Sequence, residues 1–215
     1  GILGAAGILD AAAPGIALAD NATLVAIASR TQDRADTAAS KFGAERGVVG
    51  YEALLADPEI DAVYIPLPNW LHCEWVLKAA AAGKHVLCEK PMAVTASEAR
   101  SMIDACATAG VQLGEAYMYA HHPRFDRMVE IIESGEIGTP RSIITTFSFD
   151  ASAELDHSGF QGKPGSGAVY DVGGYAIHSA RLLLGAEPLA VTARATMSQL
   201  HGDIDLATSA LVEFP

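Results

Sequence analysis

Residues 1–8 read GILGAAGI, a short apolar strand that runs into a turn of small residues. Small side chains let a backbone approach a pyrophosphate, and a helix that follows such a turn offers unpaired N–H groups. Ala6 departs from the G-x-G-x-x-G pattern because it stands where the second glycine would be. The stretch predicts a dinucleotide site, with a ligand-free turn as the alternative. The residues expected at this site are Gly4, Ala5, Ala6, Gly7 and Ile8.

Beyond this turn, apolar strand-like runs alternate with amphipathic helical stretches through residue 120. Such alternation predicts a parallel sheet with helices on its faces. Helix ends are marked by Thr95 with Glu98, which form a capping-box pattern, and by Gly43, Gly83 and Gly110 at left-handed positions. The further strands are expected at 24–29, 61–66, 85–88 and 111–119.

The pattern changes after residue 120. We expect a helix at 123–134, a glycine-rich loop and a helix at 174–184, with strands at 141–149, 191–197 and 206–214. The predicted fold class is α/β: a Rossmann-type doubly wound parallel sheet in residues 1–120, followed by an α+β open-faced sheet domain in 121–215. We expect truncation at both ends, because the chain opens within a strand and its last strand stops without a neighbour.

Composition excludes several classes of protein. A net charge of −12 argues against a nucleic-acid or membrane-surface partner, since both need clustered Lys and Arg. No apolar run reaches the roughly 18 residues needed to span a bilayer. Three cysteines, Cys73, Cys88 and Cys106, lie at no metal-ligand spacing within predicted helices and a strand. We therefore expect no metal and a reducing, cytoplasmic location.

The second strand ends in Ser29-Arg30-Thr31. An NAD enzyme places an acidic residue there to bind the ribose 2′-hydroxyl, whereas an arginine accommodates a 2′-phosphate. Ser29 and Arg30 therefore favour NADP, with NAD still possible. The alternative is that Arg30 is only a solvated residue at a strand end.

Four further segments carry a family resemblance: PNWLH at 68–72, EKP at 89–91, EAYMY at 115–119 and GSGAVYDVGGY at 165–175. Together with the opening turn they resemble the glucose-fructose oxidoreductase/inositol dehydrogenase (Gfo/Idh/MocA) family. The motifs are most similar to the D-xylose dehydrogenase, glucose-fructose oxidoreductase and dimeric dihydrodiol dehydrogenase branch. The resemblance covers essentially the whole chain and implies a Rossmann domain followed by an open-faced sheet domain.

The resemblance implies two catalytic residues. Lys90 would lie beside the nicotinamide and the reacting carbon, and Tyr175 would carry the proton. An ammonium beside a phenol lowers the pKa of the phenol from about 10, as a general base requires. A solvated lysine and a packed helical tyrosine are the structural alternatives. The resemblance also assigns nicotinamide-side or cleft positions to Pro66, Asn69, His72, Glu89 and Lys90.

Asp171, Tyr175 and His178 have helical spacing that places them along one face. Many relatives read D-x-G-x-H-x-x-D, so Tyr175 and His178 here replace the usual His and final Asp. Asp171 is expected either to bind substrate or to cap the helix, and His178 either to bind substrate or to be structural. Tyr119 is a further expected substrate contact. Ala120 stands where several relatives have Arg.

These features predict an NADP-dependent oxidoreductase that acts on a sugar or related polyol or carbonyl, of D-xylose dehydrogenase type. The alternatives are a dehydrogenase for a diol, anhydro-sugar or amino-sugar, and a non-catalytic NAD(P)-binding regulator. The segment 150–165 is expected to govern substrate choice. The resemblance also implies a homo-oligomer that forms through the second-domain sheet.

Overall fold

The computed structural model describes residues 1–151, 161–200 and 202–215. Much of segment 150–165, which is expected to govern substrate choice, therefore lies outside the described residues. Internal contacts divide the chain into unit 1, Gly1–Ala116, and unit 2, Tyr117–Pro215. The division falls slightly before the expected boundary at residue 120. None of the described helices combines the length and apolar character that crossing a bilayer requires.

Unit 1 is built on a parallel sheet of six strands in the order β3-β2-β1-β4-β5-β6. The order reverses between β1 and β4, which is the topological switch point where doubly wound sheets bind ligands. The predicted Rossmann-type α/β class is thereby confirmed. The strands are β1 (Ile2–Leu3), β2 (Ala26–Ser29), β3 (Arg46–Val49), β4 (Ala62–Ile65), β5 (His85–Glu89) and β6 (Leu113–Ala116).

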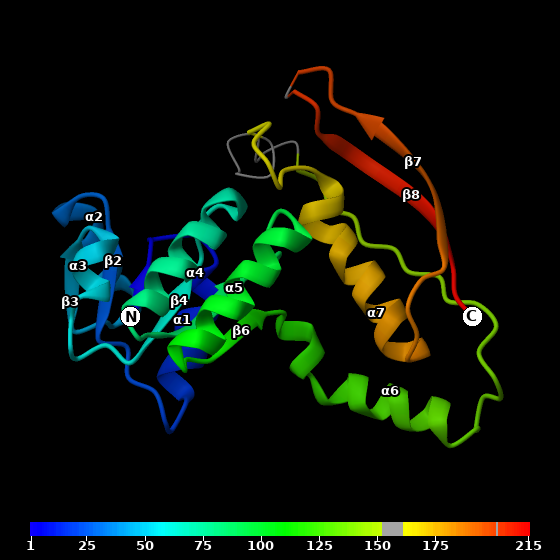
Figure 1. The fold of residues 1–215 in the computed structure, drawn as a ribbon, viewed down its shortest axis with the longest axis horizontal. Coiled ribbons are helices and arrows are strands. Elements are labelled where there is room, and N and C mark those ends of the chain that lie inside the picture. The colour runs from blue at the N-terminus through cyan, green and yellow to red at the C-terminus, as the bar shows by residue number, and fades with distance from the viewer. Residues whose placement is uncertain (152–160, 201) are drawn as a thin grey trace. The chain divides into compact units, whose positions relative to one another are not determined.

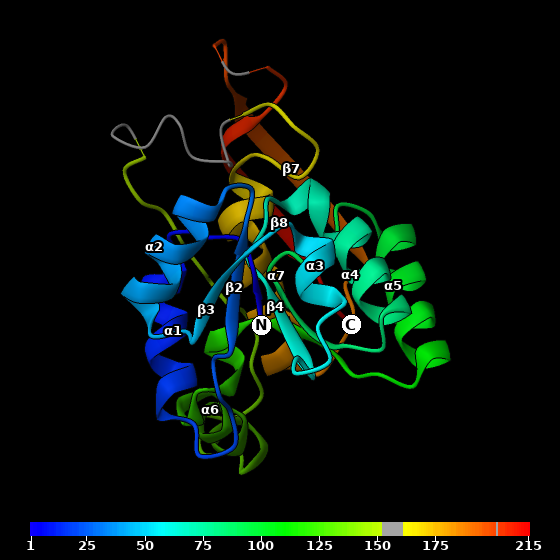
Figure 2. The same ribbon diagram turned by 90° about the vertical axis from the view of Figure 1, so that its left-hand side faces the viewer.

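Helices cover both faces of this sheet, and each face has its own apolar cluster. One cluster includes Ile2, Leu9 and Ile27, beneath α1 (Leu9–Leu18) and α2 (Gln32–Phe42). The larger cluster lies beneath α3 (Tyr51–Leu55), α4 (His72–Ala81) and α5 (Ala96–Ala109). Figure 2 shows α1 and α2 on one side of the strands and α4 and α5 on the other. Both faces of the central strands β1 and β2 are thus buried, as is typical of parallel sheets, whereas β5 exposes His85 and Leu87 on one face.

Local signals placed the helix ends correctly. Gly43, Gly83 and Gly110 adopt φ of 74°, 70° and 69°, the left-handed conformation that glycine tolerates best. Thr95 Oγ1 accepts a hydrogen bond from Glu98 N at 3.1 Å, and the Glu98 carboxylate accepts one from Val94 N at 3.0 Å. The capping interaction at the start of α5 is therefore confirmed.

Unit 2 contains α6 (Pro123–Glu133), a π-helical turn η4 (Val169–Gly173), α7 (Gly174–Leu184) and an antiparallel ribbon of β7 (Ala190–Met197) and β8 (Asp205–Glu213), seen in Figure 1. The expected helices and last two strands are confirmed. The strand expected at 141–149 is wrong, because that segment has no regular structure. A strand needs a hydrogen-bonded neighbour, and within the described ranges β7 and β8 pair only with each other.

Candidate functional site

The glycine turn lies at the switch point of the sheet. Gly4 N donates to Ala28 O at 2.9 Å, so the turn is attached to the neighbouring strand β2. Gly4 has φ +110°, and a Cβ there would lie 3.0 Å from Leu67 Cδ2, so both conformation and space favour glycine. The N–H groups of Leu9 and Asp10 already bond to the carbonyls of the turn. The donors that could meet a phosphate are thus those ahead of Leu9 rather than those of the helix itself.

A hollow of about 340 Å³ lies beside the turn. The turn contributes Ala5, Ala6 and Gly7 to its wall, and α2 contributes Asp33 and Arg34. The small residues of the turn allow close approach to its backbone, as the predicted dinucleotide requires. Arg34 lies in the first turn of α2, four residues after Arg30, and was missed by sequence reasoning.

Tyr51 lies beside the turn. Its ring packs edge-on against Trp75 at 4.9 Å, and its hydroxyl lies 3.5 Å from where a Cβ on Gly4 would be. Burial raises the pKa of the Tyr51 phenol, while the charges of Arg30 and Arg34 act in the opposite direction. Tyr51 is therefore a protonated phenol close to the turn and within electrostatic reach of Arg30 and Arg34.

Glu89, at the end of β5, is held as a hydrogen-bond acceptor. Tyr64 Oη donates to its Oε1 at 2.5 Å, and Lys90 N donates to its Oε2 at 3.1 Å. Burial and the neighbouring Glu89 charge both raise the pKa of Tyr64, so the phenol remains a donor. Sequence reasoning selected Glu89 but missed Tyr64, because a tyrosine within a strand is typical of core packing.

The segment after Lys90 is fixed by two further side chains. Glu115 Oε1 accepts from Met92 N at 2.8 Å. His72 is 0% exposed, and its Nδ1 and Nε2 face the carbonyl oxygens of Pro91 at 2.9 Å and Leu67 at 2.7 Å. This geometry revises our expectation that His72 contacts the cofactor. It instead joins the loop after β4 to the loop that carries Lys90.

The remaining predicted residues of unit 1 lie at the same edge of the sheet. Ser29 ends β2 and is buried, with its carbonyl accepting from Gly50 N at 2.9 Å. Arg30 follows and is exposed, and Pro66 follows β4 and is buried. Asn69 opens a short 3-10 helix, η1 (Asn69–Leu71). Carboxyl ends of neighbouring strands thus bring most of the predicted cofactor positions together.

In unit 2, Tyr175 lies in the first turn of α7 among aromatic rings. It stacks on Tyr117 at 5.0 Å and contacts Tyr119 and Phe147 at 5.3 and 5.2 Å. A Cβ on Gly174 would come within 2.6 Å of Tyr117 Oη. Gly174 is therefore the residue that admits Tyr117, and Tyr117 in turn fixes the ring of Tyr175.

Asp205 of β8 anchors the glycine-rich segment that leads into α7. Its Oδ2 accepts from Val169 N at 3.0 Å and from Thr208 Oγ1 at 2.7 Å. A Cβ on Gly167 would lie 2.2 Å from Asp205 Oδ1, so the carboxylate needs glycine there. Sequence reasoning missed Asp205, because the contact spans two elements far apart in the chain.

Asp171 lies in the π-helical turn η4, ahead of α7. The N-terminus of α7 has Gly173 at its cap position and no side-chain cap hydrogen bond. Asp171 therefore does not occupy the cap position of α7. The wider π turn moves Asp171 away from the regular helical position that its spacing suggested, so the expected alignment with Tyr175 and His178 does not follow from α-helical geometry alone.

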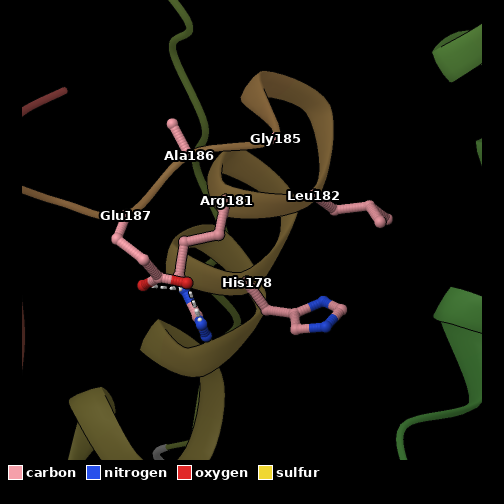
Figure 3. A pocket seen from close by; sticks show the side chains of 6 residues that line it. All are labelled: His178, Arg181, Leu182, Gly185, Ala186 and Glu187. Carbon is pink, nitrogen blue, oxygen red and sulfur yellow. Dashed lines mark hydrogen bonds and ion pairs between the residues drawn. The ribbon is translucent and has the colours of Figure 1, made fainter. Parts of the chain in front are cut away.

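His178 follows Tyr175 by one helical turn, and its Nδ1 is hydrogen-bonded to Tyr119 Oη. His178 also borders a hollow of about 270 Å³ together with Arg181, Leu182, Gly185, Ala186 and Glu187. Arg181 and Glu187 form a bidentate pair at 2.8 and 2.5 Å, so the guanidinium is already neutralised. Figure 3 shows the imidazole turned away from that pair. We therefore associate His178 with Tyr119 and Tyr175 rather than with this hollow.

The neighbouring histidines do not suggest a metal site. His122 Nδ1 accepts from Arg124 N at 3.1 Å and caps α6. Among the residues that the structure describes, no three His, Cys, Asp or Glu side chains gather in a way that could hold a metal ion.

Family models match both halves of the chain. Residues 1–117 match an oxidoreductase family described by an NAD-binding Rossmann fold, and residues 125–215 match the GFO/IDH/MocA C-terminal domain. The chain is 42% identical over 215 residues to D-xylose 1-dehydrogenase (NADP(+)) 2 from Haloferax volcanii. The alignment covers 100% of this chain and 65% of that relative. It is 38% identical over 191 residues to a dTDP-3,4-didehydro-2,6-dideoxy-alpha-D-glucose 3-reductase from Saccharopolyspora spinosa, covering 88% and 56%.

A solved structure of a 3-ketoreductase from Actinomadura kijaniata, in complex with NADP and TDP-benzene, matches with a TM-score of 0.87 and 33% identity, covering 98% of this chain and 64% of that one. Other solved structures of that ketoreductase carry a lysine replaced by glutamate or alanine, or a tyrosine replaced by phenylalanine. The chain thus spans less than two thirds of the length of these relatives. On both domain matches, the chain belongs to the GFO/IDH/MocA oxidoreductase family.

Proposed function

We propose that the protein is an NADP-dependent oxidoreductase that interconverts an alcohol and a carbonyl group on a sugar or related polyol. The observation that carries this proposal is the glycine turn at the switch point of a 3-2-1-4-5-6 sheet, with Arg30 at the end of the neighbouring strand. An arginine in the position of the ribose-binding acid favours a 2′-phosphate. The names of the relatives, an NADP-dependent xylose dehydrogenase and a keto-sugar reductase, support the same class.

The residues of unit 1 would hold and orient the nucleotide. The turn from Gly4 to Gly7 would receive the pyrophosphate, and Arg30 with Arg34 the 2′-phosphate. When bound, the nicotinamide supplies or accepts the hydride. The loop that carries Lys90 is fixed on both sides by Glu89, Glu115 and His72. Such fixation holds the backbone from which the Lys90 side chain extends, which would help to position the ammonium.

Lys90 and Tyr175 would share the proton chemistry. In the oxidation direction, Tyr175 takes the proton of the substrate hydroxyl as the carbinol carbon loses its hydride, and Lys90 stabilises the charge on the oxygen. Reduction follows the same path in reverse, with Tyr175 returning the proton to the carbonyl oxygen. The two residues belong to different units, and their pairing is inferred from the resemblance of the EKP and D-x-G-x-Y motifs.

The test is to incubate the purified full-length protein with NADP⁺ or NAD⁺ and a panel of aldoses that includes D-xylose, while recording the absorbance of the reduced nicotinamide. We expect turnover with NADP⁺ and a Lys90→Ala variant slower by about 10² to 10⁴-fold. Lys78→Ala is the matched control, because Lys78 of α4 forms exposed ion pairs with Glu52 on α3 and Glu74 on α4. Full turnover by Lys90→Ala would contradict the proposed chemistry, and nucleotide binding without turnover on any substrate would favour a regulator.

A further inference from the structure

One hydrogen bond in unit 2 joins two elements that are far apart in the sequence. Tyr119 belongs to the 3-10 helix η2 (Met118–His121), and its hydroxyl meets Nδ1 of His178 on α7. Tyr119 lies edge-on to the imidazole at 5.6 Å, and Tyr117 is tilted against it at 5.1 Å. Phe125 packs edge-on against Tyr119 at 4.7 Å from the other side. These rings hold the His178 side chain in one orientation.

The direction of this hydrogen bond fixes the tautomer of His178. Burial raises the pKa of Tyr119, and a charge on Tyr175 would raise it further, so the phenol keeps its proton. Within the described part of the chain, that phenol has no hydrogen-bond acceptor other than Nδ1 of His178. If Tyr119 is the donor, a neutral imidazole carries its own proton on Nε2.

His178 lies next to the proposed proton carrier on α7. Tyr175 and His178 are three residues apart on α7 and so are neighbours on its surface. The ring of Tyr117 contacts both side chains, at 5.0 Å from Tyr175 and 5.1 Å from His178. The one anionic group near His178 in its hollow, Glu187, is paired with Arg181. No described residue forms a hydrogen bond with Nε2 of His178, so this nitrogen is available to a ligand.

We propose that Tyr119 holds His178 as a fixed hydrogen-bond donor, and that His178 is a specificity-determining residue that binds a second oxygen of the substrate. This inference rests on the proposed function, in which Tyr175 handles the oxygen of the reacting carbon. A substrate with an acceptor oxygen on a neighbouring carbon, such as a polyol, would satisfy both side chains. A simple alcohol or aldehyde would leave the Nε2–H without a partner on the substrate, and a site built to bind a substrate oxygen discriminates against an analogue that lacks it.

The first test needs no turnover. In full-length protein labelled with ¹⁵N-histidine, we expect the NMR signals of His178 to report a proton on Nε2 and none on Nδ1. Tyr119→Phe should give a mixture of tautomers. A proton on Nδ1 in the unaltered protein would overturn the inference, as would an unchanged tautomer in Tyr119→Phe. If that variant does not fold, the tautomer of the unaltered protein decides, whatever becomes of the proposed function.

The second test separates recognition from a structural role. The rate of reduction of D-glyceraldehyde and of propanal by NADPH is measured for the variants His178→Asn and His178→Gln. The asparagine amide takes the place of Nδ1 of the imidazole, and the glutamine amide takes the place of Nε2. We expect His178→Asn to lower kcat/KM about tenfold for D-glyceraldehyde only, and His178→Gln to restore most of that loss. An equal loss on both aldehydes would contradict recognition of a second oxygen. The control is His121→Asn, which replaces an exposed histidine of η2.

Discussion

Units 1 and 2 differ in how they hold their functional residues. In the described chain, nearly all buried apolar side chains belong to unit 1, whereas unit 2 contributes Phe125 and Ile204. The side chains of β7 are all exposed, and those of β8 mostly so. Unit 1 fixes its loops from a packed sheet, while unit 2 fixes Tyr175 through particular contacts from Tyr117, Gly174 and Asp205. We infer that unit 1 acts as a rigid framework, whereas unit 2 holds the proposed proton carrier in place through a few specific contacts.

The largest expected effect is on stability, when a leucine is replaced by alanine in unit 1 and, separately, in unit 2. Leu54 in α3 is 0% exposed and Leu211 in β8 is 69% exposed. Leu54→Ala removes packed methyl groups and should lower the free energy of unfolding by about 2–5 kcal/mol. Leu211→Ala should change it by about 0.5 kcal/mol or less. Urea unfolding followed by circular dichroism measures both. Equal losses would break the comparison, because they would mean that the face of β8 is covered in the working protein.

The second effect, on stability and turnover, comes from His72, which joins the loop after β4 to the loop that carries Lys90. His72→Leu keeps the site apolar and filled but removes the ring nitrogens that face the carbonyls of Leu67 and Pro91. A buried acceptor left unpaired costs about 1–3 kcal/mol, so we expect a loss of about that size in stability. Turnover should fall more than NADP affinity, because the loop carries Lys90. His121→Leu serves as a control, since His121 is exposed. A selective loss of NADP affinity, with stability unchanged, would instead indicate direct contact with the cofactor.

A smaller effect tests whether unit 1 alone sets the choice of nucleotide. Arg30→Ala should weaken NADP binding by about 10 to 100-fold, the range of a lost charge-assisted hydrogen bond, and leave NAD binding nearly unchanged. Calorimetric titration with each nucleotide measures the two affinities. Arg34→Ala should show a weaker form of the same selectivity. If both nucleotides lose affinity equally, Arg30 does not bind a 2′-phosphate.

The parts of the fold that could be predicted from the sequence are those determined by residues close together in the chain. The turn at Gly4, the left-handed stops at Gly43 and Gly83, and the cap at Thr95 each depend on residues a few positions apart. Strand β3 was not singled out, because Arg46 and Gly47 interrupt any apolar alternation. A Cβ on Gly47 would lie 2.6 Å from the backbone of α2, so its role is seen only in three dimensions.

The candidate site divides in the same way. Motifs selected Glu89 and Lys90, but the groups that hold them, Tyr64, His72 and Glu115, act through contacts 19 to 25 residues apart in sequence. The strand expected at 141–149 was wrong because alternation specifies a face and not a partner. Local pattern thus predicts which residue types serve a site, while packing decides which of them touch a ligand and which position another residue.

The most direct test of the division between frame and chemistry is a single-turnover measurement on Tyr175→Phe. Full-length protein saturated with NADPH is mixed with D-xylulose, D-glyceraldehyde or another carbonyl substrate that the unaltered protein reduces, and the loss of reduced-nicotinamide absorbance is followed. We predict that the variant binds NADPH with unchanged affinity and reacts about 10² to 10⁴-fold more slowly. A single-turnover rate equal to that of the unaltered protein would contradict the account, because the proton would then come from another group.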